Sequence, residues 1–402
     1  MSNPVQDQYE AYPYPGRNPA EEKARLITGS PSRLLEIDHY LFGGRRDWTR
    51  PFRALVAGGG TGDATVMLAQ QLADARTPAE IVYLDLSSAS RAIAEQRIAA
   101  RGLANVRFLN GSLLELGALG LGGFDYIDCC GVLHHLPDPA AGLASLTGAL
   151  APGGGIGLMV YGEYGRTGVY PLQAALRQLA GDMPLNEQVG LAKQLLKILP
   201  ATNAFRQNRI LGDHQRGDAE LVDLLLHRQD RAYTVPQLAE LAAGAGLAVA
   251  SFIEPIRYDP GLYLADPALA KRAATLPALE QAALAERLAS NMKLHIAYLT
   301  REAGSVARPS PDAIPLLIEW DAAAIAKSVQ QQGAIKGAFD GLPVTLPLPR
   351  QAPAILSRID GRRTLSDIQR EMEKLPDWAA FMTLFQPIYR ALNGINRLVL
   401  RF

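Results

Sequence analysis

The stretch from Ala54 to Asp63, which reads ALVAGGGTGD, constrains the fold of this chain more than any other. Its apolar residues predict a buried strand, its glycines a tight turn, and the residues after it (Ala64 to Leu72) a helix. Glycine lets the backbone turn sharply and lets a ligand approach bare main chain. The first amides of the helix lack partners and mark the positive end of its dipole. We therefore expect an α/β protein whose first loop binds an anionic or carboxylate-bearing, nucleotide-like ligand.

A second apolar run, from Ile81 to Ser87, carries a carboxylate at the end of the expected strand, Asp85. Asp85 follows Gly62 by 23 positions, close to the spacing of roughly 20 residues at which an acidic side chain holds the two hydroxyls of a ribose. The alternative is that Asp85 caps the helix that follows. The glycine loop does not fit the dinucleotide pattern G-x-G-x-x-G, because Asp63 occupies the position of its third glycine.

The pattern G-x-G-x-G, formed by Gly58, Gly60 and Gly62, resembles motif I of the class I S-adenosylmethionine-dependent methyltransferases. Residues 124–139 are similar to the family's fourth strand and exit loop, and residues 150–155 to the turn before its fifth strand. The resemblance implies a Rossmann-like, mostly parallel sheet of seven strands and S-adenosyl-L-methionine as the cofactor. It also implies that the chain is an enzyme, which transfers a methyl group to a nitrogen or oxygen nucleophile.

The same resemblance assigns the cofactor site. The loop glycines would line the methionine end, Asp85 would bind both ribose hydroxyls, and residues near Leu113 would flank the adenine. Two carboxylates common in the family are missing here, because Val56 and Ser112 occupy their positions, and Asp63 is a candidate substitute for the first. The predicted cofactor residues are Gly58, Gly59, Gly60, Thr61, Gly62, Asp63, Asp85, Leu86, Ser112, Leu113, Cys130 and Gly131.

Methyl transfer from a sulfonium requires above all that the acceptor be aligned and water excluded, and a base helps when the acceptor arrives protonated. His134 and His135 follow the fourth strand and are candidates for this base, with a structural role as their alternative. Glu163, after the fifth strand, is the other candidate base or amine ligand. The predicted acceptor-binding residues are aromatic or basic: Tyr9, Tyr12, Tyr14, Tyr161, Tyr164 and Arg166. For the last of these the alternative is a solvated loop charge.

The 402 residues exceed one core of ordinary size and divide on their patterns into three parts. Residues 1–50 form an N-terminal arm, either packed on the domain or closing over the site as an aromatic lid. Residues 51–303 form the methyltransferase domain, with a helical insertion at 162–231 over the sheet edge that binds ligands. Residues 304–402 form a small α+β domain that resembles the winged-helix, PqqD-like domains that grip peptides, with a helical packing or dimerisation appendage as the alternative.

Over residues 53–160, short apolar runs alternate with helical patterns, which indicates a parallel sheet covered by helices. The insertion breaks this rhythm, since its patterns are helical throughout. We expect its longer helices over residues 172–179, 186–199 and 218–227. The expected strands lie near residues 53–57, 81–86, 106–109, 125–130, 156–161, 248–254 and 294–299.

Composition narrows the classes of partner. Lys+Arg and Asp+Glu both number 40, so the formal net charge is zero and no bulk attraction to nucleic acid is expected. The two cysteines, Cys129 and Cys130, are neighbours, and the six histidines show no ligand spacing, so neither a disulfide nor a metal site is expected. No apolar run approaches the roughly 18 residues of a membrane span, and the N-terminus does not resemble a signal peptide. The cytoplasm is the expected location.

The acceptor is the least determined feature. The insertion and the C-terminal region are large for an enzyme that acts on a small molecule, which favours a peptide or protein acceptor. A small-molecule acceptor is the first alternative. The second is a scaffold or sensor that holds the cofactor without catalysis, which the missing carboxylates at Val56 and Ser112 favour.

Overall fold

The computed structural model describes residues 4–302, 304–372 and 377–402 of the chain. These residues form two compact units. The first comprises residues 4–34, Trp48–Leu247 and Ser290–Ile296. The second comprises Leu35–Asp47, Ala248–Ala289 and the described part of Ala297–Phe402. The boundary expected at residue 304 therefore falls inside the second unit, because segments from before it belong to the same compact body.

A mostly parallel sheet forms the centre of the fold. Its strands are β1 Phe52–Ala57, β2 Ala79–Asp85, β3 Val106–Asn110, β4 Phe124–Cys130, β5 Leu150–Tyr161, β6 Ala248–Phe252 and β7 Leu294–Thr300. The seven strands have the order β3-β2-β1-β4-β5-β7-β6, with β6 antiparallel to β7. β1 pairs in parallel with both β2 and β4. This confirms the predicted seven-stranded Rossmann-like sheet.

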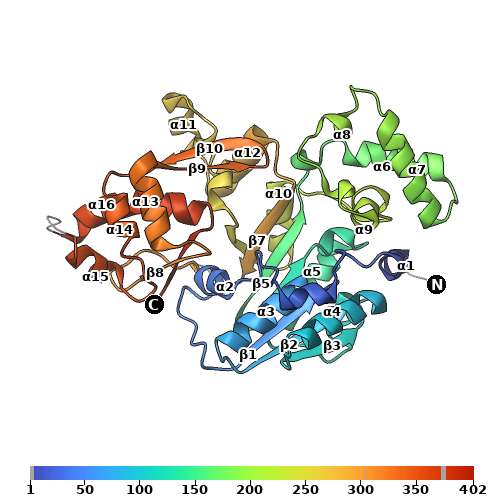
Figure 1. Ribbon diagram of the computed structural model, residues 1–402, viewed down its shortest axis with the longest axis horizontal. Coiled ribbons are helices and arrows are strands. Elements are labelled where there is room, and N and C mark those ends of the chain that lie inside the picture. The colour runs from blue at the N-terminus through green and yellow to red at the C-terminus, as the bar shows by residue number, and fades with distance from the viewer. Residues whose placement is uncertain (1–3, 303, 373–376) are drawn as a thin grey trace. The chain divides into compact units, whose positions relative to one another are not determined.

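The glycine loop begins the first crossover, as predicted. Gly62 has φ 102° and precedes α3 (Asp63–Asp74), and a Cβ on Gly62 would lie 2.8 Å from that of Ala94. Only glycine lets α3 approach α4 (Ser88–Ala100) so closely, and the two helices lie side by side along β1, β2 and β3 (Figure 1). The chain order reverses between β1 and β4, which opens a crevice at the carboxyl ends of these strands.

The region after β5 is helical, as expected. It contains α6 Val169–Ala180, α7 Leu185–Ile198, α8 Ala204–Gln207 and α9 Asp218–Leu221, which pack around a small apolar core of their own (Figure 1). The helix expected over 218–227 is wrong in form, because a π-helical turn, Val222–Leu226, replaces its second half. Such turns reset the direction of side chains and occur often at functional sites. The sheet then resumes through α10 (Val235–Gly244), which Thr234 caps.

The first unit also contains short helices near its N-terminus and after β4. At the N-terminus, α1 (Pro4–Ala11) contacts α4, and the 3-10 turn Pro19–Lys23 follows it. After β4, α5 (Pro139–Ala149) contacts α10 and leads into β5. The arm is therefore partly helical.

The second unit has its own apolar core, which includes Leu356, Phe381 and Phe385. Two antiparallel pairs flank this core, β8 Ile314–Leu317 with β11 Leu398–Arg401 and β9 Ala334–Phe339 with β10 Leu342–Pro347. Its helices are α2 Leu34–Leu41, α11 Pro267–Ala273, α12 Ala278–Ala289, α13 Ala322–Gln332, α14 Ala352–Leu356, α15 Leu365–Arg370 and α16 Trp378–Gly394. The winged-helix resemblance of this region stays a prediction.

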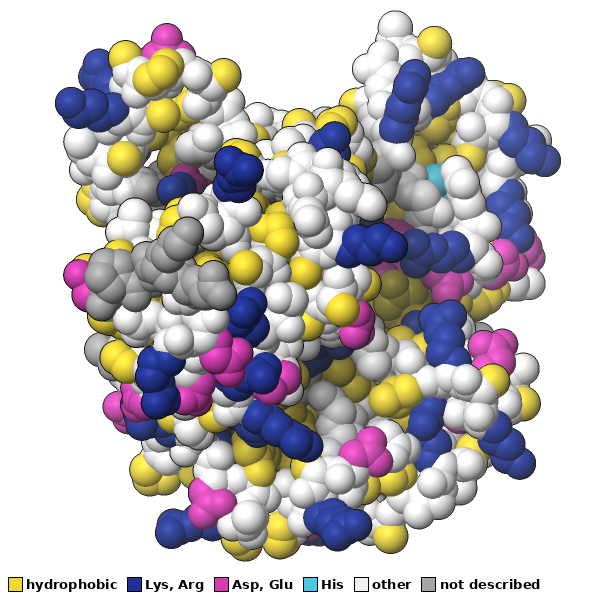
Figure 2. Space-filling view, turned by 60° about the vertical axis from the view of Figure 1, so that its left-hand side comes forward, with side chains coloured by type: hydrophobic (Ala, Val, Ile, Leu, Met, Phe, Trp, Pro, Cys, Tyr) yellow, Lys and Arg dark blue, Asp and Glu magenta, His cyan; other side chains and the backbone are white. Residues whose placement is uncertain are grey.

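Charged side chains of both signs are interspersed over the face shown in Figure 2, in agreement with the equal numbers of acidic and basic residues. Among the described residues, no helix combines the length and the apolar character needed to cross a membrane.

Candidate functional site

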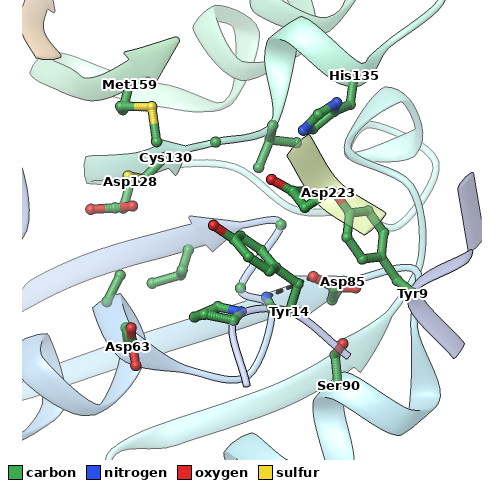
Figure 3. Close-up of a pocket in the computed structure, with 18 of the residues that line it drawn as sticks. Tyr9, Tyr14, Asp63, Asp85, Ser90, Asp128, Cys130, His135, Met159 and Asp223 are labelled. Atoms are coloured by element: carbon green, nitrogen blue, oxygen red, sulfur yellow. Dashed lines mark hydrogen bonds between the residues drawn. The ribbon is translucent and has the colours of Figure 1, made fainter. Parts of the chain in front are cut away.

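A cavity of about 650 Å³ opens at the carboxyl ends of β1, β2 and β4. Cofactor and small-ligand pockets occupy roughly 300–1,000 Å³. The walls come from four parts of the first unit: the glycine loop, the strand ends, the N-terminal arm and the helical insertion. Figure 3 shows ten of the lining residues by name.

Most of the predicted cofactor residues line the cavity. They are Gly58, Gly59, Gly60, Asp63, Asp85, Leu86, Ser112, Leu113, Cys130 and Gly131. Thr61 and Gly62 do not, which corrects the prediction for these two. Thr61 turns toward the N-terminal arm and donates from its hydroxyl to the Pro15 carbonyl (2.7 Å). Gly62 serves the close packing of α3 against Ala94 instead.

Asp85 lies at the end of β2 and holds the glycine loop. Its Oδ2 accepts a hydrogen bond from the Gly60 amide (2.7 Å, dashed in Figure 3), and its Oδ1 accepts one from the Ser87 amide (2.8 Å). The cap of α4 is Ser87, whose hydroxyl accepts from the Ser90 amide, so the capping alternative for Asp85 does not hold. Burial raises the pKa of Asp85, although these two amides oppose the shift. Each carboxylate oxygen keeps a lone pair for a hydroxyl in the cavity.

The N-terminal arm lies across the glycine loop. The Thr61 amide donates to the Tyr14 carbonyl (3.3 Å), and the Tyr14 side chain lines the cavity. Arg17 donates from Nε to Asp63 Oδ1 (2.8 Å) and from Nη2 to Oδ2 (2.6 Å). At the start of α4, the Glu10 carboxylate accepts from the Ser88 amide (2.6 Å). The arm thus packs on the glycine loop and α4 and supplies part of the cavity wall.

Asp63, the candidate substitute for the carboxylate missing at Val56, is paired within the fold. Arg17 binds it from the arm, and Arg97 Nη1 of α4 donates to its Oδ1 (2.7 Å). Burial would raise the pKa of Asp63, but the two guanidinium groups outweigh burial and hold it below the ordinary value. Asp63 lines the cavity with its charge paired to two guanidinium groups, and its role toward the cofactor stays a prediction.

A second carboxylate, Asp223, faces the cavity from the π-helical turn. Tyr161 donates from its hydroxyl to Asp223 Oδ2 (2.7 Å), and Tyr9 donates to Oδ1 (3.2 Å). Burial raises the pKa of Asp223, opposed by the Tyr161 hydrogen bond and the charge of Arg166. Figure 3 shows Tyr9 and Asp223 together at one side of the cavity. The sequence analysis missed this residue, whose only signal was an acid within the apolar run LVDLLL.

The two histidines after β4 differ in their relation to the cavity. His135 lines the cavity, and its Nδ1 contacts the Gln229 carbonyl (3.0 Å). Burial lowers the pKa of His135 to about 4, so it is a weak base at neutral pH. His134 is fully buried, stacks on Tyr161 at 3.8 Å and does not line the cavity, which corrects its assignment as a catalytic base.

Glu163, Tyr12 and Tyr164 were expected at the site, but none of them lines the cavity. Glu163 is exposed at the rim after β5, and Tyr12 packs on the core of the insertion. The insertion contributes other residues to the cavity wall, among them Leu211, Asp223 and Leu224. Arg166 does line the cavity.

Arg166 is not the solvated loop charge weighed as its alternative. Its guanidinium lies 3.6 Å from the centre of the Tyr161 ring, and its Nη2 lies 3.3 Å from Asp230 Oδ2. Arg166 therefore braces the tyrosine that contacts Asp223.

The described residues contain a group with metal-ligand chemistry, which the sequence spacing did not predict. One ligand atom each from His135, Asp223 and His227 lies within 4.8 Å of the others. Hydrogen bonding explains their proximity without a metal. His227 Nδ1 accepts from the Gln229 amide (3.0 Å), so the ring proton sits on Nε2, which contacts the Tyr9 hydroxyl (3.2 Å). The proton on Nε2 occupies the lone-pair position that a metal would need.

Residues 55–156 match the sequence profile of a family described as methyltransferase domain. By sequence similarity these residues are a methyltransferase domain. The computed structure has the fold of PKMT2 from Rickettsia typhi, with 18% identity, a TM-score of 0.61, and coverage of 93% of this chain and 77% of that one. The same protein in complex with AdoHcy gives 17% identity, a TM-score of 0.60, and coverage of 91% and 74%.

An uncharacterised protein of Synechococcus sp. is 34% identical to this chain over 260 residues. The match covers 63% of this chain and 60% of the relative. The chain therefore spans less than two thirds of the length of this relative.

The residues of the methyltransferase domain fit S-adenosylmethionine as the cofactor. The cavity lies against the glycine loop, Asp85 presents carboxylate lone pairs at the end of β2, and Ser112 and Leu113 line the part reached by β3. The glycine loop lies within the residues that match the methyltransferase profile, in agreement with its resemblance to motif I.

Replacing Asp85 with alanine is expected to weaken the binding of S-adenosylhomocysteine by about 5- to 150-fold, because a charge-assisted bond to ribose hydroxyls contributes roughly 1–3 kcal/mol. Isothermal titration calorimetry measures this affinity. The matched control is Ser87→Ala, which removes the cap of α4 but no cavity residue and should leave the affinity nearly unchanged. An Asp85→Ala protein that binds as tightly as the wild type would refute the ribose assignment.

Proposed function

We propose that the chain transfers a methyl group from S-adenosylmethionine to a side-chain amine of a peptide or protein, with lysine as the acceptor residue. The observation that carries this proposal is Asp223, a buried carboxylate that faces the cofactor cavity. The likeness to PKMT2 hints at protein lysine methylation, and the cavity supplies a physical reason for it.

The wall around Asp223 suits an alkylammonium group. Tyr9, Tyr14 and Tyr161 all line the same cavity, so aromatic rings and phenol hydroxyls surround the carboxylate. Aromatic faces attract cations when water is excluded, and apolar ring surface accommodates the methylene stem of a lysine. A buried carboxylate requires a cationic partner, and an incoming ammonium would be one.

A protonated amine must lose a proton before its nitrogen can attack. When bound, S-adenosylmethionine would supply the methyl group, and S-adenosylhomocysteine would be the leaving group, with the electron pair of the broken S–C bond on its sulfur. Asp223 would hold the ammonium, accept its proton and leave the nitrogen lone pair to form the new N–C bond. Since burial raises the pKa of Asp223, this carboxylate is a stronger base than an exposed aspartate. The Tyr9 and Tyr161 hydroxyls hold the carboxylate in place, each on a different oxygen.

One experiment distinguishes this proposal from a small-molecule methyltransferase and from a non-catalytic scaffold or sensor. The chain is incubated with donor labelled on the methyl group and with a cell extract, and the products are divided into protein and small molecules. We expect label in protein that, after acid hydrolysis, migrates with methylated lysines. Label only among the small molecules would overturn the protein acceptor. Binding of the donor without any transfer would favour the scaffold or sensor.

A further inference from the structure

Asp128 is a carboxylate that the sequence analysis did not assign. It lies on β4, between apolar residues, with only 1% of its surface exposed, and it lines the cavity. In the parallel pairing of β1 with β4 it stands opposite Val56, the position where the family often carries an acidic residue. The missing acid on β1 therefore has a counterpart at the same level on the neighbouring strand.

The contacts of Asp128 leave one oxygen open to the cavity. Ser32 donates from its hydroxyl to Oδ2 (2.6 Å), and the Tyr126 hydroxyl, which also donates to the Pro31 carbonyl (2.8 Å), lies 3.2 Å from the same atom. Among the described residues, none donates to Oδ1 and no Lys, Arg or His pairs with the carboxylate. Burial raises the pKa of Asp128 to about 6, so it is mostly ionised at neutral pH. A buried charge without a cationic partner is costly unless a ligand supplies the partner.

We propose that Asp128 binds the α-ammonium group at the amino-acid end of the cofactor, in place of the carboxylate that β1 lacks at Val56. This inference rests on the proposed use of S-adenosylmethionine. The ammonium would donate to Oδ1, while Ser32 and Tyr126 keep the carboxylate oriented through Oδ2.

The position of Asp128 separates it from the acceptor-binding carboxylate. Figure 3 shows Asp128 and Asp63 on one side of the cavity and Tyr9 and Asp223 on the other. Arg17, which is paired with Asp63, lines the cavity as well.

The test compares two ligands on two proteins. S-adenosylhomocysteine carries the α-ammonium, and its analogue without the α-amino group does not. Wild type is expected to prefer the first by about 10- to 100-fold, the size of a hydrogen bond between charged groups. Asp128→Asn should reduce that preference to less than about threefold by weakening only the first ligand. The matched control, Asp74→Asn, changes an exposed carboxylate on α3 outside the cavity and should keep the preference.

The outcomes are separable. If wild type shows no preference for the amino-bearing ligand, or if Asp128→Asn keeps the wild-type preference, Asp128 does not bind the ammonium. If Asp128→Asn weakens both ligands equally, its role is to hold the strand and the inference is overturned. If wild type binds neither ligand, nor S-adenosylmethionine itself, the proposed cofactor use fails and the inference fails with it. The preference is the ratio of the affinities for the two ligands, and it is measured on wild type first. The proposal can therefore be refuted on wild type even if the Asp128→Asn variant folds poorly.

Discussion

Asp223→Asn is expected to lower the rate of methyl transfer to a lysine peptide by about 10²- to 10⁴-fold, the range that general-base catalysis contributes. Asparagine keeps the shape of the side chain, and its carbonyl oxygen still accepts a hydrogen bond from Tyr161. It carries no charge to hold an ammonium and no site to take up the proton. The change should appear mainly in kcat, since the acceptor reaches the donor in a protonated form that cannot attack.

Binding of S-adenosylhomocysteine is the internal standard for this variant. Its affinity should stay within about twofold of wild type, because Asp223 belongs to the acceptor side of the cavity and not to the strand ends. Glu163→Gln is the matched control, since Glu163 is exposed outside the cavity. This variant should transfer methyl groups at the wild-type rate. Full activity of Asp223→Asn would contradict the proposal that Asp223 is the base. A loss of rate in Glu163→Gln instead would favour Glu163.

Arg97→Ala is expected to destabilise the first unit by about 3 kcal/mol, the lower end of the cost of breaking a buried ion pair. Arg97 is fully buried on α4. Its Nε donates to Glu22 Oε1 (2.6 Å), and its Nη1 donates to Asp63 Oδ1 (2.7 Å) and to the Thr61 carbonyl (2.9 Å). One side chain thus connects the arm, the glycine loop and the helix. The lower end applies because Glu22 retains Arg101 as a partner.

Urea unfolding, followed with S-adenosylhomocysteine binding as a second probe, measures the effect of Arg97→Ala. Arg91→Ala on the same helix is the matched control. It removes a partly exposed pair with Glu95 and should cost less than about 0.5 kcal/mol. An equal loss of stability in the two variants would show that the buried network contributes no more than a surface pair.

The sequence predicted the sheet and the cofactor loop well because these features depend on local chemistry. Apolar runs ending in Gly58–Gly62 require a strand, a left-handed turn and a helix whatever the rest of the chain does. Asp85 was placed correctly at the end of β2 for the same reason, since strand periodicity alone determines where it lies. The insertion was recognised as helical, but the π-helical turn at Val222–Leu226 depends on packing that no local pattern contains.

The acceptor side shows what local patterns leave undetermined. His134 and His135 are neighbours in sequence, yet one faces the cavity and the other is buried behind it. Glu163 was a reasonable candidate from its position after β5, but its side chain is exposed and does not line the cavity. Whether a side chain faces a ligand depends on which distant segment covers it.

The sequence by itself determined the class of the domain, its cofactor and the place of the glycine loop, because each is encoded within a few adjacent residues. Only the tertiary structure decided which carboxylates face the cavity. Asp223 accepts a hydrogen bond from Tyr9, which lies 214 positions earlier in the chain. Asp128 accepts one from Ser32, which lies 96 positions earlier. Such contacts form when segments far apart in the chain are buried against each other. They depend on the packing of the whole fold, which no local sequence pattern contains.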